Sequence, residues 1–279
     1  VLVVVAFTAI NQHYNVGDVI YGRRGEENNN IFTKWNAFSR ISVQVEKEPR
    51  LLKSLRPDPN AEPLPEQRGI EIDADAYTPV LKFNGDLHTM AFLRQDLSSL
   101  GFMLADKGPV LIIGPGGGRD VLMGLLHGHH VTGVDINPII VDDLMKDRLR
   151  AFSGDLYFHP QVNIVVAEGR SFIHGDGHQY NLIDIPLVDT FAATAGGNLV
   201  LVENNLYTVE AFEDYLQHLS QDGILTISRW EFDGMRLVTL FLEASEKLGM
   251  RNPEKHIVIV GNGLQDQSTV LNNYLFKKS

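Results

Sequence analysis

Four glycines between an apolar run and a helical segment are the strongest chemical signal in this sequence. Residues 110–113 are all apolar, and the glycines follow at once. They are Gly114, Gly116, Gly117 and Gly118. Such a turn, leaving a buried strand and entering a helix, presents backbone N–H groups to a ligand. A dinucleotide fingerprint needs glycine at position 119, where this chain has Arg119. The loop predicts another kind of ligand site; the alternative is a simple tight turn.

An acidic residue follows at the spacing expected for nucleoside binding. Asp135 ends the next apolar segment, 21 residues after Gly114. A carboxylate at the end of the second strand can accept hydrogen bonds from both ribose hydroxyls. Ile136 beside it belongs to the same predicted site. The alternative is that Asp135 caps the helix that begins near Pro138.

A third element comes after the third predicted strand. Glu168, Gly169 and Arg170 stand there together. An acid with neighbouring backbone amides can bind the amino group and a ring nitrogen of adenine. Taken in this order, the three elements predict a nucleoside-binding site.

Strands and helices alternate from about residue 106 onward. Apolar runs predict strands at 110–113, 131–134, 162–166, 182–187 and 223–227. Amphipathic segments predict helices at 120–126, 138–152, 209–219 and 235–247. A last pair, 256–260 and 268–274, flanks a Gly-Asn-Gly turn and predicts an antiparallel hairpin. The pattern predicts an α/β fold, a seven-stranded Rossmann-like sheet with helices on both faces.

Composition divides the chain into three parts. Residues 1–14 form an apolar segment, which is either a buried strand or the severed end of a membrane helix. Residues 15–105 are expected to form a small β-rich N-terminal domain, with a proline-rich linker at 50–68. Residues 106–279 are expected to form the ligand-binding domain.

Charge and residue content exclude several functions. The net charge of −11 argues against nucleic acid as a partner, since phosphate contacts need clustered cations. The chain has no cysteine, and the histidines at 127, 129 and 130 are interpreted as a surface loop, so no metal is expected. No nucleophile-elbow or phosphate-loop pattern is present.

The spacing of Gly114, Gly116 and Gly118 resembles the GxGxG loop of class I S-adenosylmethionine-dependent enzymes. The chain as a whole resembles the spermidine synthase family over roughly residues 30–275. Segments that carry the resemblance are 35–41 (WNAFSRI), 110–122, 180–183 (YNLI) and 206–212 (LYTVEAF). The branch it resembles most has this domain after a bundle of membrane helices. That would explain residues 1–10 and would place the protein in the cytoplasm, at the cytoplasmic face of a membrane in the full-length form.

The resemblance also exposes differences. The family's amine-activating aspartate at the tip of the fourth strand is matched by Pro186, which cannot accept a proton. Asp189 matches the family's following aspartate, and Asp184 precedes Pro186 by two residues. We expect Asp189 first, and Asp184 second, to act as the base. The family's polyamine-binding pattern is not evident in residues 87–100.

The resemblance implies a transferase. Its donor would be S-adenosylmethionine or decarboxylated S-adenosylmethionine, and the group transferred to a small acceptor, such as a polyamine, would be methyl or aminopropyl. The alternative is a non-catalytic domain that senses a nucleoside ligand for an attached membrane region. Arg119 disfavours a nicotinamide-dependent oxidoreductase. The sequence does not specify the acceptor or the oligomeric state.

Overall fold

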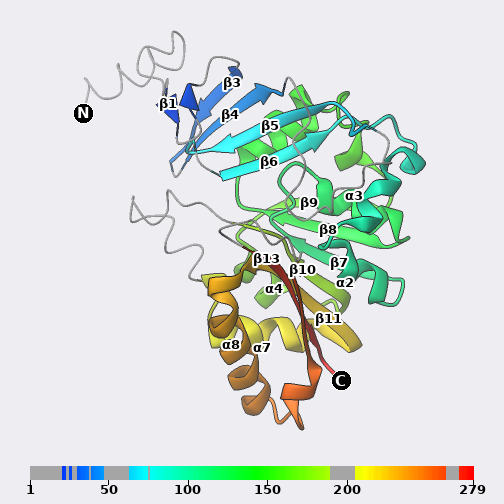
Figure 1. Cartoon of the computed structure of the whole chain (residues 1–279), viewed down its shortest axis with the longest axis vertical. Helices are drawn as coiled ribbons and strands as arrows, with labels where there is room; N and C mark the ends of the chain where they lie inside the picture. Colours follow the sequence, from blue (N-terminus) through cyan, green and yellow to red (C-terminus); the bar gives the residue numbers. More distant parts are fainter. Residues whose placement is uncertain are drawn as a thin grey trace.

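The computed structural model describes residues 21–22, 25–26, 30–37, 39–46, 63–74, 76–188, 205–261 and 270–279. These residues form a seven-stranded sheet, a four-stranded antiparallel sheet and a short two-stranded ladder. The four-stranded sheet lies at one end of the molecule and the C-terminal helices lie at the other (Figure 1). The predicted apolar segment at 1–14 lies outside the described residues.

The larger sheet has the strand order β12-β13-β11-β10-β7-β8-β9. Its strands are β7 (Pro109–Ile113), β8 (His130–Asp135), β9 (Val162–Val166), β10 (Tyr180–Ile185), β11 (Leu219–Trp230), β12 (Ile257–Gly261) and β13 (Leu271–Lys277). The pairs among β9, β8, β7, β10 and β11 are parallel, while β13 is antiparallel to both β11 and β12. The predicted seven-stranded sheet with an antiparallel C-terminal hairpin is confirmed.

Helices cover both faces of this sheet, and the strand sequences explain why. Along β7, Val110 and Ile112 belong to one core, whereas Leu111 and Ile113 belong to the other. Alternate residues of a strand point to opposite faces, so a wholly apolar strand buries both. The helical segments are η1 (Leu87–Gln95), α2 (Ser99–Leu104), α3 (Arg119–Leu126), η2 (Ile139–Arg148), η3 (Leu156–Phe158), α4 (Gly169–Gly175), α7 (Val209–His218), η4 (Glu231–Asp233), α8 (Gly234–Lys247) and η5 (Pro253–His256).

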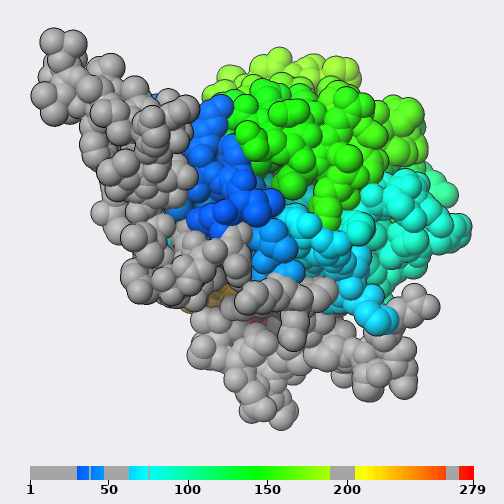
Figure 2. Space-filling view, turned by 90° about the horizontal axis from the view of Figure 1, so that it is seen from above, coloured from blue at the N-terminus to red at the C-terminus, as the bar shows by residue number. Residues whose placement is uncertain are grey.

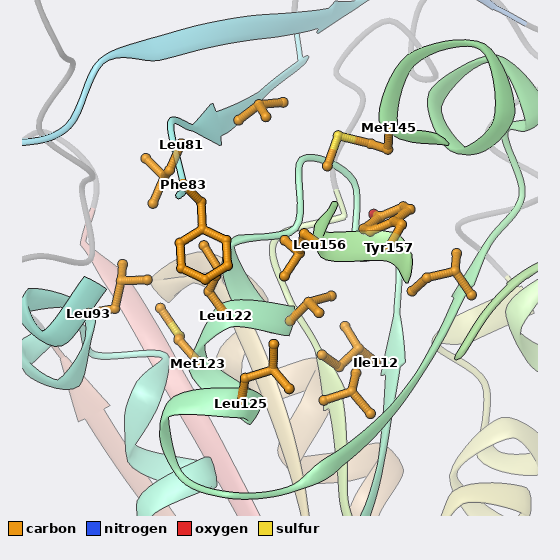
Figure 3. Close-up of a cluster of buried hydrophobic side chains, with 14 of the residues drawn as sticks. Leu81, Phe83, Leu93, Ile112, Leu122, Met123, Leu125, Met145, Leu156 and Tyr157 are labelled. Carbon is orange, nitrogen blue, oxygen red and sulfur yellow. The ribbon is translucent and has the colours of Figure 1, made fainter. Parts of the chain in front are cut away.

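The smaller sheet shares its core with the larger one. It consists of β3 (Asn30–Trp35), β4 (Arg40–Val45), β5 (Gln67–Ile72) and β6 (Ala76–Leu81), while β1 (Tyr21–Gly22) and β2 (Gly25–Glu26) form the short ladder. Leu81 and Phe83 pack in one cluster with Leu122 of α3 and Leu156 of η3 (Figure 3). The two sheets are therefore joined by apolar packing.

Several local features differ from the sequence-based expectations. The helix expected at 138–152 is η2, which has wider π-type turns and ends at Arg148. Its buried residues are Ile139, Ile140, Val141, Leu144 and Met145. Strand β10 ends at Ile185, so position 186 lies just past it. Strand β11 begins at Leu219, four residues earlier than predicted.

Segments η1 and α2 were not predicted. Helix α2 packs closely against β11 at Gly101. A Cβ at this position would lie only 2.3 Å from Cγ2 of Thr226 on β11. Among the described residues, no helix has the length and apolar character needed to cross a membrane.

Candidate functional site

The glycine loop joins β7 to α3 at the carboxyl edge of the larger sheet. Gly114, Gly116 and Gly118 have φ values of 84°, 50° and 85°, a region that disfavours residues with a side chain. Gly114 N donates to Val134 O at 2.8 Å, which fixes the loop to the neighbouring strand β8. The local sequence thus forces a tight turn that leads directly into helix α3.

The structure brings Asp135 to this loop. Its Oδ2 accepts a hydrogen bond from Gly116 N at 3.2 Å, and its Oδ1 accepts one from Asn137 N at 2.9 Å. Asp135 is only 7% exposed. This burial raises the pKa of its carboxyl, although the two hydrogen bonds act to lower it. A carboxylate therefore stands at the tip of β8 beside the glycine turn. Ile136 follows it and is half-buried.

The four-stranded sheet contributes to the same loop. Gly117 N donates to Thr78 Oγ1 of β6 at 3.0 Å. From η3, Tyr157 donates its hydroxyl to Gly116 O at 2.7 Å. A Cβ at Gly117 would lie 2.2 Å from Pro79 O, so β6 leaves no room for a side chain there. The loop conformation is fixed from three directions.

The third predicted element lies at the start of α4. Glu168 is the N-cap of that helix, and its carboxylate accepts hydrogen bonds from Arg170 N at 3.0 Å and Ser171 N at 2.8 Å. Arg170 Nε lies 3.4 Å from Asp214 of α7. Gly169 packs against Ile113, because a Cβ there would lie 2.4 Å from its Cγ2. Adenine recognition by Glu168, Gly169 and Arg170 stays a prediction.

A buried acidic cluster lies around the first residues of α3, which follow the glycine loop directly. The buried-carboxyl cluster consists of Asp96, Asp120 and Asp184, with Arg119 among them. Arg119 lies 3.2 Å from Asp120 and 3.8 Å from Asp96. Burial and the neighbouring Asp120 raise the pKa of Asp184 well above its ordinary value. Three carboxyl groups with one guanidinium favour retention of a proton within the cluster.

Asp184 is the most buried member. It is 0% exposed, and Thr226 of β11 donates to its Oδ1 at 2.7 Å. Among the residues that the structure describes, none is a hydrogen-bond partner of its Oδ2. Such an orphaned buried oxygen is costly, by roughly 1–3 kcal/mol. Pro186 is also buried, just past the strand end, and Asp189 lies outside the described residues.

The histidine segment after α3 was expected to be a surface loop; Gly128 and His130 are exposed, but His129 is not. His129 is 0% exposed, and its Nε2 lies 2.8 Å from Phe102 O. The surface-loop interpretation was wrong for His129, because this side chain contacts α2, a helix that was not predicted from the sequence. In the part of the chain that the structure describes, no group of histidines and acids could hold a metal ion.

The strand order with antiparallel β13 and the glycine turn after β7 define a class I methyltransferase-like fold. Solved structures agree. A spermidine synthase in complex with the transition-state analogue AdoDATO matches with a TM-score of 0.59 and 14% identity, covering 91% of this chain and 75% of that one. The spermidine synthase from Thermotoga maritima matches with a TM-score of 0.56 and 13% identity, over 91% and 74% of the two chains.

A curated relative matches by sequence. It is a polyamine aminopropyltransferase from Sulfurisphaera tokodaii, 25% identical over 172 residues, which are 59% of this chain and 54% of the relative. The chain thus spans about half the length of that relative. No protein-family model matches. The resemblance to spermidine synthases is confirmed, and it extends through the fold.

Several residues of the site were not singled out from the sequence. Thr78 and Tyr157 are single residues in ordinary segments, and nothing in their spacing relates them to the glycine loop. Asp120 follows Arg119 directly. This pair of opposite charges was the one sequence feature that could have indicated the ion pair between them. Asp96 had no such feature.

Proposed function

We propose that this chain is an S-adenosyl-nucleoside-dependent transferase of the aminopropyl type. The donor is decarboxylated S-adenosylmethionine and the acceptor is a polyamine; methyl transfer from S-adenosylmethionine is the variant of the same reaction. The observation that carries the proposal is the contact between Asp135 and Gly116 at the tips of β7 and β8. The Sulfurisphaera tokodaii relative supports the aminopropyl reaction.

The transfer reaction needs few catalytic groups from the protein. The acceptor nitrogen attacks the carbon next to the sulfonium, the carbon–sulfur bond breaks, and its electron pair stays on sulfur as a neutral thioether. The nitrogen then releases a proton. Positioning of the two reactants supplies much of such a rate. In this proposal Asp135 holds the ribose hydroxyls and the glycine loop passes beside the methionine-derived chain, with Ile136 lining the nucleoside.

The proton needs an acceptor other than Pro186. Asp189 is our first candidate because it follows the strand end by four residues. Asp184 is the second, since its Oδ2 accepts no hydrogen bond from the described residues. The raised pKa of Asp184 makes its carboxylate a strong base, but only the ionised fraction can act. Transfer that uses Asp184 therefore increases with pH.

A second function is favoured by one observation. A proline at the strand tip and a wholly buried Asp184 leave no exposed carboxylate on the described part of β10 or on residues 186–188. A protein with that arrangement can bind a nucleoside without transferring from it. The alternative is a nucleoside sensor that regulates an attached membrane region.

Calorimetry with purified protein tests the binding half of the proposal. The ligands are S-adenosylmethionine, its decarboxylated form, 5′-methylthioadenosine and NAD. We expect the adenosyl sulfur compounds to bind and NAD not to bind. Asp135→Ala should weaken the bound ligands by about 2–3 kcal/mol, because two ribose hydroxyls lose a charged acceptor. Asp142→Ala, which removes an exposed carboxylate on η2, is the matched control. Unchanged affinity in a folded Asp135→Ala protein contradicts the site.

Transfer assays test the catalytic half. Wild-type protein is incubated with decarboxylated S-adenosylmethionine and putrescine, and spermidine is measured. A lost base commonly costs about 10²–10⁴-fold, so slow formation is expected. Asp189→Asn should reduce the remaining rate and spare nucleoside affinity. Rapid wild-type synthesis would show that Pro186 does not replace the base. Tight nucleoside binding without transfer to any amine would favour the sensor.

A further inference from the structure

Three polar side chains close a ring of hydrogen bonds between the four-stranded sheet and the segment after Asp135. Asn36 Nδ2 donates to Asn137 Oδ1 at 3.0 Å. Asn137 Nδ2 donates to Ser39 Oγ at 2.9 Å, and Ser39 Oγ donates to Asn36 Oδ1 at 3.2 Å. We call these three residues the hydrogen-bond ring. Each member donates once and accepts once within it.

Two of the three members of the ring are buried and Asn36 is half-buried, which restricts the ring to a definite geometry. Ser39 is 5% exposed and Asn137 is 4% exposed. Rotating a member would leave a buried donor or acceptor unpaired, and that is unfavourable. Asn36 is also fixed by its own turn, in which Ser39 N donates to Asn36 Oδ1 at 2.8 Å. The ring therefore holds the side chain of Asn137 in one orientation.

Asn137 connects the ring to the carboxylate of Asp135. Its main-chain N donates to Asp135 Oδ1, while its side-chain Oδ1 also accepts from Ile139 N at 3.1 Å. The other oxygen of Asp135 faces Gly116 N. One end of the carboxylate is thus set by the glycine loop, and the other by a residue that the four-stranded sheet holds.

The β3–β4 hairpin is seated on η2 by contacts apart from the ring. Lys34 pairs with Asp143, and the guanidinium carbon of Arg148 lies 4.9 Å from the centre of the aromatic ring of Phe32. Residues of the hairpin (blue) lie directly against green residues of the larger domain in Figure 2. The Lys34–Asp143 pair is 46% and 36% exposed, so it is screened and has little effect on geometry. The orientation of Asn137 is set by the hydrogen-bond ring, in which Ser39 and Asn137 are buried.

We infer that the hydrogen-bond ring positions the Asp135 carboxylate for the ribose, so that the four-stranded sheet sets nucleoside affinity without touching the nucleoside. Asn36, Ser39 and Asn137 are positioning residues in this scheme. The inference rests on the proposed function, because Asp135 acts there on the ribose hydroxyls.

The test compares two ligands in calorimetry. One is 5′-methylthioadenosine, and the other is its 2′,3′-dideoxy form, which lacks both hydroxyls. Ser39→Ala and Asn36→Ala should each weaken the first ligand by about 3- to 10-fold. Neither should change the affinity of the second ligand. In an Asp135→Ala background, Ser39→Ala should cause no further loss. Ser39→Thr keeps the hydroxyl and should restore most of the affinity.

Lys34→Ala is the matched control, because it removes a hairpin contact with η2 outside the ring and should leave both affinities unchanged. Equal losses for both ligands would overturn the inference, since the ring would then act on packing and not through Asp135. Wild-type affinity in both ring variants would overturn it too. A wild-type protein that binds neither ligand would instead reject the proposed function, and the inference with it.

Discussion

At the scale of single residues, the most unusual group is the carboxyl of Asp184. It lies in the middle of the sheet and is 0% exposed. One oxygen accepts a hydrogen bond from Thr226, and the other has no hydrogen-bond partner in the described part of the chain. A stable fold tolerates this group because it can stay protonated. Burial and the adjacent Asp120 raise its pKa, and the folded state therefore keeps a proton that the unfolded chain releases.

This difference predicts how stability depends on pH. The contribution of Asp184 is fully present below the unfolded pKa of about 3.9 and is lost as pH rises toward the folded pKa. Asp184→Asn cannot ionise. Relative to this variant, the wild-type protein should lose about 1.4 kcal/mol of unfolding free energy per pH unit inside that window.

Urea unfolding from pH 5 to pH 9 measures the effect. Asp222→Asn, which removes an exposed carboxyl paired with Lys277, controls for a change of net charge. Parallel curves for wild type and Asp184→Asn would contradict a raised pKa at Asp184.

At the scale of elements, the site depends on how closely β6 approaches the glycine loop. Gly117 has a β6 carbonyl where a Cβ would stand, and its N–H bonds to Thr78 of the same strand. Close contact with β6 gives a physical reason for glycine at position 117.

Gly117→Ala should therefore destabilise the protein by about 1–3 kcal/mol, as overpacking does. The Cβ would have to displace Pro79 O, which is backbone and cannot rotate away. Gly175→Ala, whose Cβ would meet nothing within 4 Å, is the control and should leave stability within about 0.5 kcal/mol of the wild type. Equal unfolding midpoints for the two variants in urea would show that β6 and the loop separate readily.

Strands and helices could be predicted where the pattern of apolar residues and glycines determines the local structure. The apolar run of β7 and its glycines predicted a buried strand and a turn, and both exist. The buried-carboxyl cluster was not predictable, because Asp96, Asp120 and Asp184 are far apart in sequence. They meet only after η1 packs against α3 and α3 packs against β7, the neighbour of β10. The hydrogen-bond ring has the same origin, since Asn36 and Asn137 are 101 positions apart.

Roles of single side chains were harder to predict than their positions. Glu168 stands where the motif places it, yet its carboxylate caps α4. A capping acid and a ligand-binding acid have the same residue type at the same place, and only the partner differs. The sequence contains the position of such a residue but not its partner.

At the scale of the whole molecule, the two sheets behave as parts of one packed body. One core cluster contains Ile41, Val43 and Ile70 of the small sheet together with Val110 and Leu182 of the large one. Separating the sheets would expose this apolar surface to water, at roughly 25 cal/mol per Å². The hydrogen-bond ring and Thr78 add polar contacts across the same boundary.

The whole described structure should therefore unfold in a single transition, and the sequence provides a direct probe of it. The chain has two tryptophans, Trp35 on β3 and Trp230 at the end of β11, so each sheet carries one. Trp230→Phe leaves a probe of the small sheet, and Trp35→Phe leaves a probe of the large sheet. Within each variant, fluorescence and far-ultraviolet circular dichroism should give the same urea midpoint, because a shared core couples the two sheets. Saturating 5′-methylthioadenosine should raise both midpoints together. A fluorescence midpoint of the Trp230→Phe variant well below its dichroism midpoint would mean that the small sheet unfolds first, and that the shared core does not couple the sheets.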